Sequence, residues 1–198
     1  MLYKRRERFN RASERLGSVL SRVPLSANQW TLLSLLTALL TGALIVFHYF
    51  LAAAFFLAVT ALLDVIDGAV ARQRKRAGPR GAYLDTITDR YAEFLILAAF
   101  IVVPLPSLLL PATAWILFCL VGGFMTTYAK SAAAEKHVAD EVRGGLMERS
   151  ERLLLLIVAA IAAAFSSLAV VAVLAIFAVL ANVTALQRIH TAFTRSKL

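Results

Sequence analysis

Three long stretches without a charged side chain dominate this 198-residue chain. They cover residues 28–63, 94–129 and 153–187 and hold 36, 36 and 35 residues. A transmembrane helix needs about 20 apolar residues, so each stretch is too long for one span and slightly short for two. We therefore expect each stretch to form a helical hairpin whose helices extend into the charged segments. The pattern predicts an all-α integral membrane protein with six transmembrane helices in three hairpins.

The composition also indicates a membrane protein. Hydrophobic residues make up 60% of the chain, whereas a soluble domain holds about 45–50%. The net charge of +9 would suggest nucleic-acid binding in a soluble protein. In a membrane protein it indicates basic edges that face anionic headgroups or a phosphate-bearing substrate, so we expect no nucleic-acid partner. The single cysteine, Cys119, lies within an apolar run and is expected to pack in the core.

The distribution of charge predicts how the hairpins are oriented. The turns are expected near residues 48–51, 104–111 and 165–168. Every Lys and Arg lies in one of four other segments, namely 1–22, 72–90, 130–152 and 188–197. By the positive-inside rule, the side that carries these segments is cytoplasmic. We expect a multi-pass protein of the cell membrane with both termini on the cytoplasmic side.

Residues 1–22 combine seven basic side chains with apolar residues at helical spacing. This pattern predicts an amphipathic juxtamembrane helix in the membrane interface, followed by one six-span domain over residues 23–198. A cleaved signal peptide is the alternative. The long basic region and the lack of a small-x-small cleavage site before a soluble domain argue against it.

Four aspartates interrupt the apolar pattern between the second and third predicted spans. On one helix, a stripe at i, i+3, i+4, i+7 and i+8 holds Asp64, Asp67, Gly68, Ala71 and Arg72. On the next helix, a stripe at i, i+4 and i+8 holds Gly81, Asp85 and Asp89. Two helices joined by a short basic loop can bring these stripes together and gather four carboxylates in a small volume.

Gathered carboxylates need a compensating cation, because like charges at close range oppose each other's ionisation. Oxygen ligands without His or Cys suit Mg²⁺ or Mn²⁺, and two ions about 4 Å apart suit displacement at a phosphate. The glycines let a substrate approach the backbone, and Arg72 can hold a phosphate oxygen. Aspartates that merely solvate helix ends would not be expected to share this register.

The aspartate stretch resembles the signature of CDP-alcohol phosphatidyltransferases, D-x2-D-G-x2-A-R-x8-G-x3-D-x3-D. Residues 64–89 match every fixed position and spacing, and the six-span layout and chain length are also similar to the family. The resemblance implies a homodimeric enzyme of phospholipid biosynthesis. It further implies that a CDP-linked lipid, either CDP-diacylglycerol or CDP-archaeol, binds at the cytoplasmic mouth.

The resemblance also implies roles for the signature residues. Asp64, Asp67 and Asp85 would hold one metal ion, and Asp85 and Asp89 the second. Asp89 would in addition be the catalytic general base for the acceptor hydroxyl, which attacks the lipid-side phosphorus while CMP leaves. The residues implied to line the nucleotide are Gly68, Ala71, Arg72 and Gly81.

The chain departs from the family pattern at two places near the implied nucleotide site. Members often carry P-N-x-x-T before the first span, and here Asn28, Gln29, Trp30 and Thr31 keep the Asn and Thr but lack the Pro. Many members have Ser or Thr three residues before the second glycine, where this chain has Gly78. We expect a hydroxyl contact to the nucleotide to be missing there.

The segment 130–152 bears on the acceptor alcohol. Its G-L-x-E-R run at 145–149 resembles the inositol-phosphate branch of the family, which comprises phosphatidylinositol phosphate and archaetidylinositol phosphate synthases. The resemblance implies inositol 1-phosphate as acceptor, with its phosphate in a basic pocket of Lys130, Arg149 and Arg188. Glycerol 3-phosphate is the alternative acceptor. Positive charge is also the default at a cytoplasmic edge, which would give these residues a role in topology alone.

Two further expectations concern residues outside the signature. Glu93 is expected to be a helix-edge carboxylate paired with Arg90, and Gly122 and Gly123 are expected at close-packing sites. A divalent-cation transporter is the alternative from another functional class, because intramembrane carboxylates can line an ion path. The clustering of the carboxylates at one mouth argues against a path that crosses the membrane.

Overall fold

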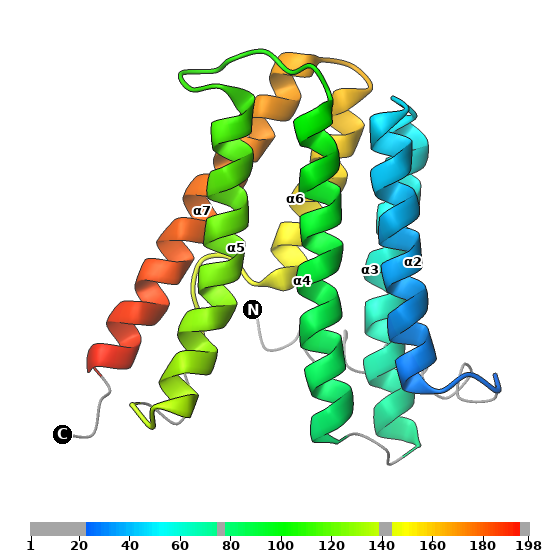
Figure 1. Ribbon diagram of the computed structural model, residues 1–198, viewed down its shortest axis with the longest axis vertical. Helices are drawn as coiled ribbons and strands as arrows, with labels where there is room; N and C mark the ends of the chain where they lie inside the picture. The colour runs from blue at the N-terminus through cyan, green and yellow to red at the C-terminus, as the bar shows by residue number, and fades with distance from the viewer. Residues whose placement is uncertain (1–22, 75–77, 139–143, 195–198) are drawn as a thin grey trace, which may run out of the picture.

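The computed structural model describes residues 23–74, 78–138 and 144–194. These residues form six helices: α2 (Ala27–Val46), α3 (Phe50–Gln73), α4 (Pro79–Val102), α5 (Ala112–Glu135), α6 (Arg149–Ala163) and α7 (Ser167–Thr194). The helices form an elongated bundle, and the turns α2–α3, α4–α5 and α6–α7 lie at the same end of it (Figure 1). The three predicted hairpins and the positions of their turns are therefore confirmed.

Local sequence explains where several helices begin. The Ser26 hydroxyl accepts a hydrogen bond from the Gln29 amide, and the Gln29 side chain accepts one from the Ser26 amide, which caps α2. Proline occupies the first turn of α4, where its missing N–H costs nothing. At α6, Glu148 and Glu151 form the same reciprocal cap.

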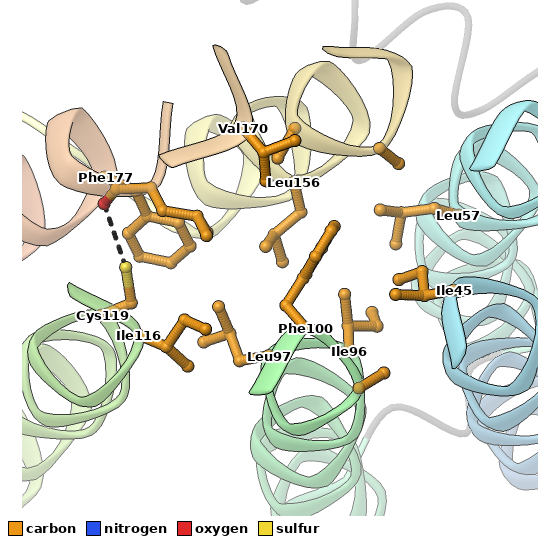
Figure 2. Packing of buried hydrophobic residues seen from close by; sticks show 14 of the residues in the cluster. Ile45, Leu57, Ile96, Leu97, Phe100, Ile116, Cys119, Leu156, Val170 and Phe177 are labelled. Atoms are coloured by element: carbon orange, nitrogen blue, oxygen red, sulfur yellow. Dashed lines mark hydrogen bonds between the residues drawn. The ribbon is translucent and has the colours of Figure 1, made fainter. Parts of the chain in front are cut away.

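The core of the bundle lies among all six helices. α2 packs against α3 and α4, α5 packs along α7, and α6 contacts α3 and α7. Figure 2 shows Phe100 of α4 pointing into the centre of the core, and Phe177 and Cys119 close together near α5 and α7. The Cys119 thiol is buried and donates to the Leu174 carbonyl at 3.2 Å, so its predicted packing role is confirmed.

Four of the described helices, α2, α3, α5 and α7, are long and apolar enough to cross a membrane. Large apolar side chains such as Leu36, Phe55 and Leu117 are more than half exposed on them, as lipid-facing residues would be. The other two helices differ because α4 carries a charged N-terminal half and α6 has only 15 residues. At 1.5 Å per residue α6 is about 22 Å long, shorter than the bilayer core of about 30 Å.

The structure thus confirms an all-helical membrane-type protein with six described helices. The stronger prediction of six full spans stays a prediction. The predicted interfacial helix over residues 1–22 lies outside the described residues.

Candidate active site

The aspartates lie on two helices, α3 and α4, that both pack against α2. Asp64 and Asp67 belong to α3, Asp85 and Asp89 belong to α4, and α2 packs against both helices. In Figure 1, α3 and α4 extend past the point at which α6 begins, so the N-terminus of α6 lies beside the middle of the bundle. Ion pairs of Arg149 with Asp64 of α3 and with Asp85 and Asp89 of α4 show that the two predicted stripes come together beside the start of α6.

Arg149, the first residue of α6, contacts three of the four aspartates. Its Nη2 is 2.5 Å from Asp64 Oδ2 and also forms an ion pair with Asp89 Oδ1. Its Nη1 is 3.7 Å from Asp85 Oδ1. One guanidinium therefore balances carboxylates from both α3 and α4, which the sequence had not indicated.

Thr31 of α2 orients the fourth aspartate. The Thr31 hydroxyl donates to Asp67 Oδ2 at 2.6 Å, and both residues are only 4% exposed. A hydroxyl has one proton, so this short bond outweighs the longer 3.1 Å contact of the same oxygen with the Ala27 carbonyl. The Thr of the incomplete P-N-x-x-T pattern thus contacts an aspartate of the signature.

The aspartate cluster has the chemistry of a divalent-cation site. Asp64 Oδ1 is buried and has no hydrogen-bond partner among the residues that the structure describes, so one carboxylate oxygen is available as a ligand. Three carboxylates already approach one cation, and oxygen donors suit Mg²⁺ or Mn²⁺. Within 23–74, 78–138 and 144–194, no three His, Cys, Asp or Glu side chains converge closely enough to share one ion. In this arrangement the Arg149 guanidinium pairs with three of the carboxylates.

The first pocket lies where α2, α3 and α4 meet. The residues that line it include Asn28, Thr31, Asp67, Gly68, Ala71, Arg72, Gly78, Gly81 and Asp85. The four residues implied to line a nucleotide are all among them. A Cβ atom at Gly68 would lie 3.2 Å from Arg72 Nη1, so a larger residue there would crowd this arginine.

Two of the predicted nucleotide-site residues lie elsewhere. Gln29 is used in the cap of α2, where its Oε1 accepts from the Ser26 amide at 2.7 Å. Trp30 packs against Leu63, Ile66 and Val70 of α3 instead of lining the first pocket. The helical period explains both, because residues 28 and 31 share one face of α2 and residues 29 and 30 do not.

A second pocket adjoins the aspartates on the side of α5, α6 and α7. Its lining includes Asp89, Glu148 and five cations, namely Arg90, Lys130, Arg149, Arg152 and Arg188. The three basic residues predicted for an acceptor phosphate are therefore brought together. Arg188 is held in place by bonds from Nη1 to the Thr126 carbonyl at 2.7 Å and from Nε to the Gly144 carbonyl at 3.0 Å.

A glycine turn and two hydrogen bonds position the start of α6 beside this pocket. Gly144 and Gly145 have φ angles of 99° and 122°, which side chains with a Cβ rarely adopt. The Met147 amide then donates to Thr184 Oγ1 at 3.0 Å, and the Leu146 amide donates to the Gln187 side chain at 3.1 Å. α7 therefore fixes where Arg149 begins its helix.

Comparison with known proteins agrees with the geometry. The family model of the CDP-alcohol phosphatidyltransferases matches residues 25–189, which include both pockets and all four aspartates. The chain belongs to the CDP-alcohol phosphatidyltransferase family. Membership of a transferase family argues against the cation-transporter alternative.

Several relatives are named as synthases of lipids that carry inositol phosphate. The archaetidylinositol phosphate synthase of Pyrococcus horikoshii is 30% identical over 159 residues, covering 80% of this chain and 81% of that protein. The phosphatidylinositol phosphate synthase of Mycobacterium tuberculosis is 29% identical over 196 residues, covering 96% of this chain and 89% of that protein.

Crystal structures of the Mycobacterium tuberculosis phosphatidylinositol phosphate synthase share the fold. The complex of that enzyme with manganese and citrate has a TM-score of 0.80 and 26% identity, and it covers 92% of this chain and 89% of that one. Its complex with CDP-DAG has a TM-score of 0.78 and 25% identity, over 93% of this chain and 94% of that one.

One polar cluster in this phosphatidyltransferase was not expected. Glu93 does pair with Arg90, as predicted, but it is not at a helix edge: it is 6% exposed and also pairs with Arg152. The prediction was wrong because Glu93 continues the inward-facing stripe of α4 one turn beyond Asp89. The sequence features that could have predicted this cluster are the i+4 spacing of Glu93 from Asp89 and the position of Arg152 three residues after Arg149.

The two glycines of α5 are close-packing sites, as expected. A Cβ at Gly122 would meet Ala181 Cβ and the Asn182 side chain of α7 at 2.8 Å. A Cβ at Gly123 would instead overlap the Glu93 carboxylate. Neighbouring glycines therefore serve two different contacts, one with α7 and one with the buried charges of α4.

Proposed function

We propose that this protein is a membrane phosphotransferase of phospholipid biosynthesis that releases CMP from a CDP-linked lipid and joins the lipid phosphate to inositol 1-phosphate. The observation that carries the proposal is the position of Asp89. This carboxylate belongs to the aspartate cluster and also lines the pocket that holds five cationic side chains. A carboxylate between a metal-type site and a basic pocket can serve a phosphorylated alcohol as its general base.

The first pocket is proposed to hold the cytidine diphosphate. Gly68 and Gly81 leave room for the nucleotide against the backbone, and Arg72 supplies a planar donor for a phosphate oxygen. A Cβ added to Gly78, just before α4, would meet no atom within 4 Å, so the pocket is open where other members have a hydroxyl. Asn28 and Thr31 complete the wall from α2, whereas Gln29 and Trp30 act only through the position of this helix.

Asp64, Asp67, Asp85 and Asp89 are proposed to hold Mg²⁺ or Mn²⁺ at two sites. When bound, the metal neutralises charge on the diphosphate and makes its phosphorus easier to attack. Arg149 competes for the same oxygens, because it already contacts three of these aspartates. The manganese found in the mycobacterial relative supports this assignment.

The second pocket is proposed to hold the acceptor phosphate. Lys130, Arg149 and Arg188 line it, and three cations suit a phosphate dianion. Asp89 then takes the proton of the attacking hydroxyl, the new O–P bond forms on the lipid side, and the bond to CMP breaks. Names of relatives from both bacteria and archaea support inositol phosphate as the acceptor and leave the lipid open between diacylglycerol and archaeol.

The membrane arrangement is part of the same proposal. Residues 23–198 form one domain with six spans, preceded by an interfacial helix over residues 1–22, and the protein is a homodimer in the cell membrane. The hairpin turns at one end of the bundle and the basic pocket towards the other support an active site and two termini on the cytoplasmic side.

The test is CMP release by the purified protein in detergent. CDP-diacylglycerol or CDP-archaeol is supplied with Mg²⁺ or Mn²⁺ and, separately, inositol 1-phosphate, glycerol 3-phosphate or serine. We expect release with inositol 1-phosphate. Release with glycerol 3-phosphate alone would refute the acceptor, and no release with any of the alcohols would refute the proposed function.

A further inference from the structure

A buried carboxylate joins two buried guanidinium groups beneath the second pocket. Glu93 Oε2 is 2.7 Å from Arg90 Nη1, and Glu93 Oε1 is 3.1 Å from Arg152 Nε. The three side chains are at most 10% exposed. Taking such charges out of water is costly, and ionisable groups inside a membrane bundle usually serve a function.

Helix α5 fixes both guanidinium groups from the other side. Arg90 Nη1 donates to the Gly123 carbonyl at 3.1 Å, and Arg152 Nη1 donates to Thr126 Oγ1 at 3.2 Å. Each arginine is thus held between Glu93 and a group of α5. The close approach of Glu93 to Gly123 leaves no space for a side chain at that position.

Both arginines also line the second pocket. Arg90 directly follows Asp89 in α4, and Arg152 lies one turn after Arg149 in α6. Arg90 and Arg152 carry like charges that repel each other, and Glu93 is the carboxylate that pairs with both. Removing its charge leaves Arg90 and Arg152 to separate or to pair with Asp89.

We propose that Glu93 is a positioning residue for the acceptor, because it holds Arg90 and Arg152 together in the wall of the pocket that takes the acceptor phosphate. This inference rests on the proposed function, which places a phosphorylated alcohol in that pocket. Glu93 touches neither substrate. It acts through the two arginines, and its effect is therefore confined to the acceptor side of the reaction.

The test compares substitutions of Glu93 on α4 with substitutions of two glycines on α5, all in the full-length protein. Glu93→Gln is expected to raise the KM for inositol 1-phosphate about 10- to 100-fold, because a charge-assisted bond to each arginine is lost. The KM for the CDP-lipid is expected to change less than about twofold, since Glu93, Arg90 and Arg152 are not among the residues that line the first pocket. Glu93→Asp, which keeps the charge, is expected to recover part of the loss.

Gly123→Ala is the second perturbation, because its methyl group displaces the Glu93 carboxylate without removing any charge. It is expected to raise the acceptor KM in the same way. Gly122→Ala is the matched control: it adds the same methyl group one residue away, but against Ala181 and Asn182 of α7. The control is expected to lower the melting temperature and to raise the acceptor KM less than Gly123→Ala does, because its methyl group meets α7 instead of the Glu93 carboxylate.

Three results would overturn the inference: an unchanged acceptor KM in folded Glu93→Gln, an equal rise in the KM for the CDP-lipid, or an equal effect of Gly122→Ala and Gly123→Ala. Binding of inorganic phosphate, measured by calorimetry, separates this inference from the proposed function. If the wild-type protein releases no CMP, the proposed function fails. Weaker phosphate binding by Glu93→Gln still supports the positioning role, and unchanged binding refutes it.

Discussion

Thr31→Val tests whether α2 takes part in the chemistry of the site. Valine has nearly the shape of threonine but cannot donate a hydrogen bond, so the substitution removes the 2.6 Å bond to Asp67 Oδ2 and little else. Both residues are 4% exposed, which means that water cannot readily replace the lost donor. The Asp67 carboxylate is then free to rotate away from the cleft.

The expected loss follows from the type of bond. A hydrogen bond to a charged group contributes about 1.5–3 kcal/mol, and about 1.4 kcal/mol corresponds to a factor of ten. Loss of a residue that orients a metal ligand lowers metal affinity or activity about 10- to 100-fold, in the same range. We therefore expect Thr31→Val to weaken Mn²⁺ binding, measured by electron paramagnetic resonance, and to slow CMP release by about this factor.

Thr41→Val provides the control on the same helix. Thr41 is also buried, but its hydroxyl donates at 2.8 Å to the Thr37 carbonyl within α2 itself. This variant is expected to keep wild-type Mn²⁺ affinity and turnover. The reasoning is wrong if Thr31→Val binds Mn²⁺ within about twofold of the wild type, or if Thr41→Val loses as much activity as Thr31→Val.

Three further predictions concern the reacting groups. Asp89→Asn should lower kcat about 100- to 10,000-fold as expected for loss of a general base, with an unchanged melting temperature, and substantial remaining turnover would contradict its role. Arg149→Gln should bind Mn²⁺ more tightly in electron paramagnetic resonance titrations, because a cation that competes for Asp64 and Asp89 is removed. Its KM for inositol 1-phosphate should rise. Weaker Mn²⁺ binding by this variant would refute the competition. EDTA should abolish CMP release and added Mg²⁺ or Mn²⁺ should restore it, whereas activity that survives EDTA would rule out metal at the aspartates.

Much of the fold could be predicted from the sequence, because the charges and prolines that bound an uncharged run mark where a membrane helix begins and ends. The three uncharged runs predict the hairpins, and the prolines at 104–111 mark the turn between α4 and α5. Whether each helix crosses the whole membrane was harder to predict, since hydropathy does not distinguish a helix that faces lipid from one that is covered by other helices. Three charged side chains of α4, Asp89, Arg90 and Glu93, are buried in the bundle, so the average hydropathy of this helix does not show how it packs.

The site was predictable to the extent that its residues are close in sequence. Spacing along α3 and α4 predicts which aspartates share a face, because the helical period is fixed. Spacing cannot predict that α2 packs against both of these helices, that Thr31 bonds to Asp67, or that Arg149 contacts Asp64 from 85 residues away. Those contacts depend on how separate helices pack.

The sequence alone therefore determined the helical hairpins, the side on which the charges gather and the four aspartates in two registers, since each follows from local periodicity and the cost of charge in lipid. Only the tertiary structure decided the partners of those charges. It brought Arg149 between the aspartates, collected Lys130 and Arg188 around one pocket, and buried Glu93 against two arginines. Ion pairs between helices depend on three-dimensional packing, because no local rule specifies which distant cation will reach a buried carboxylate.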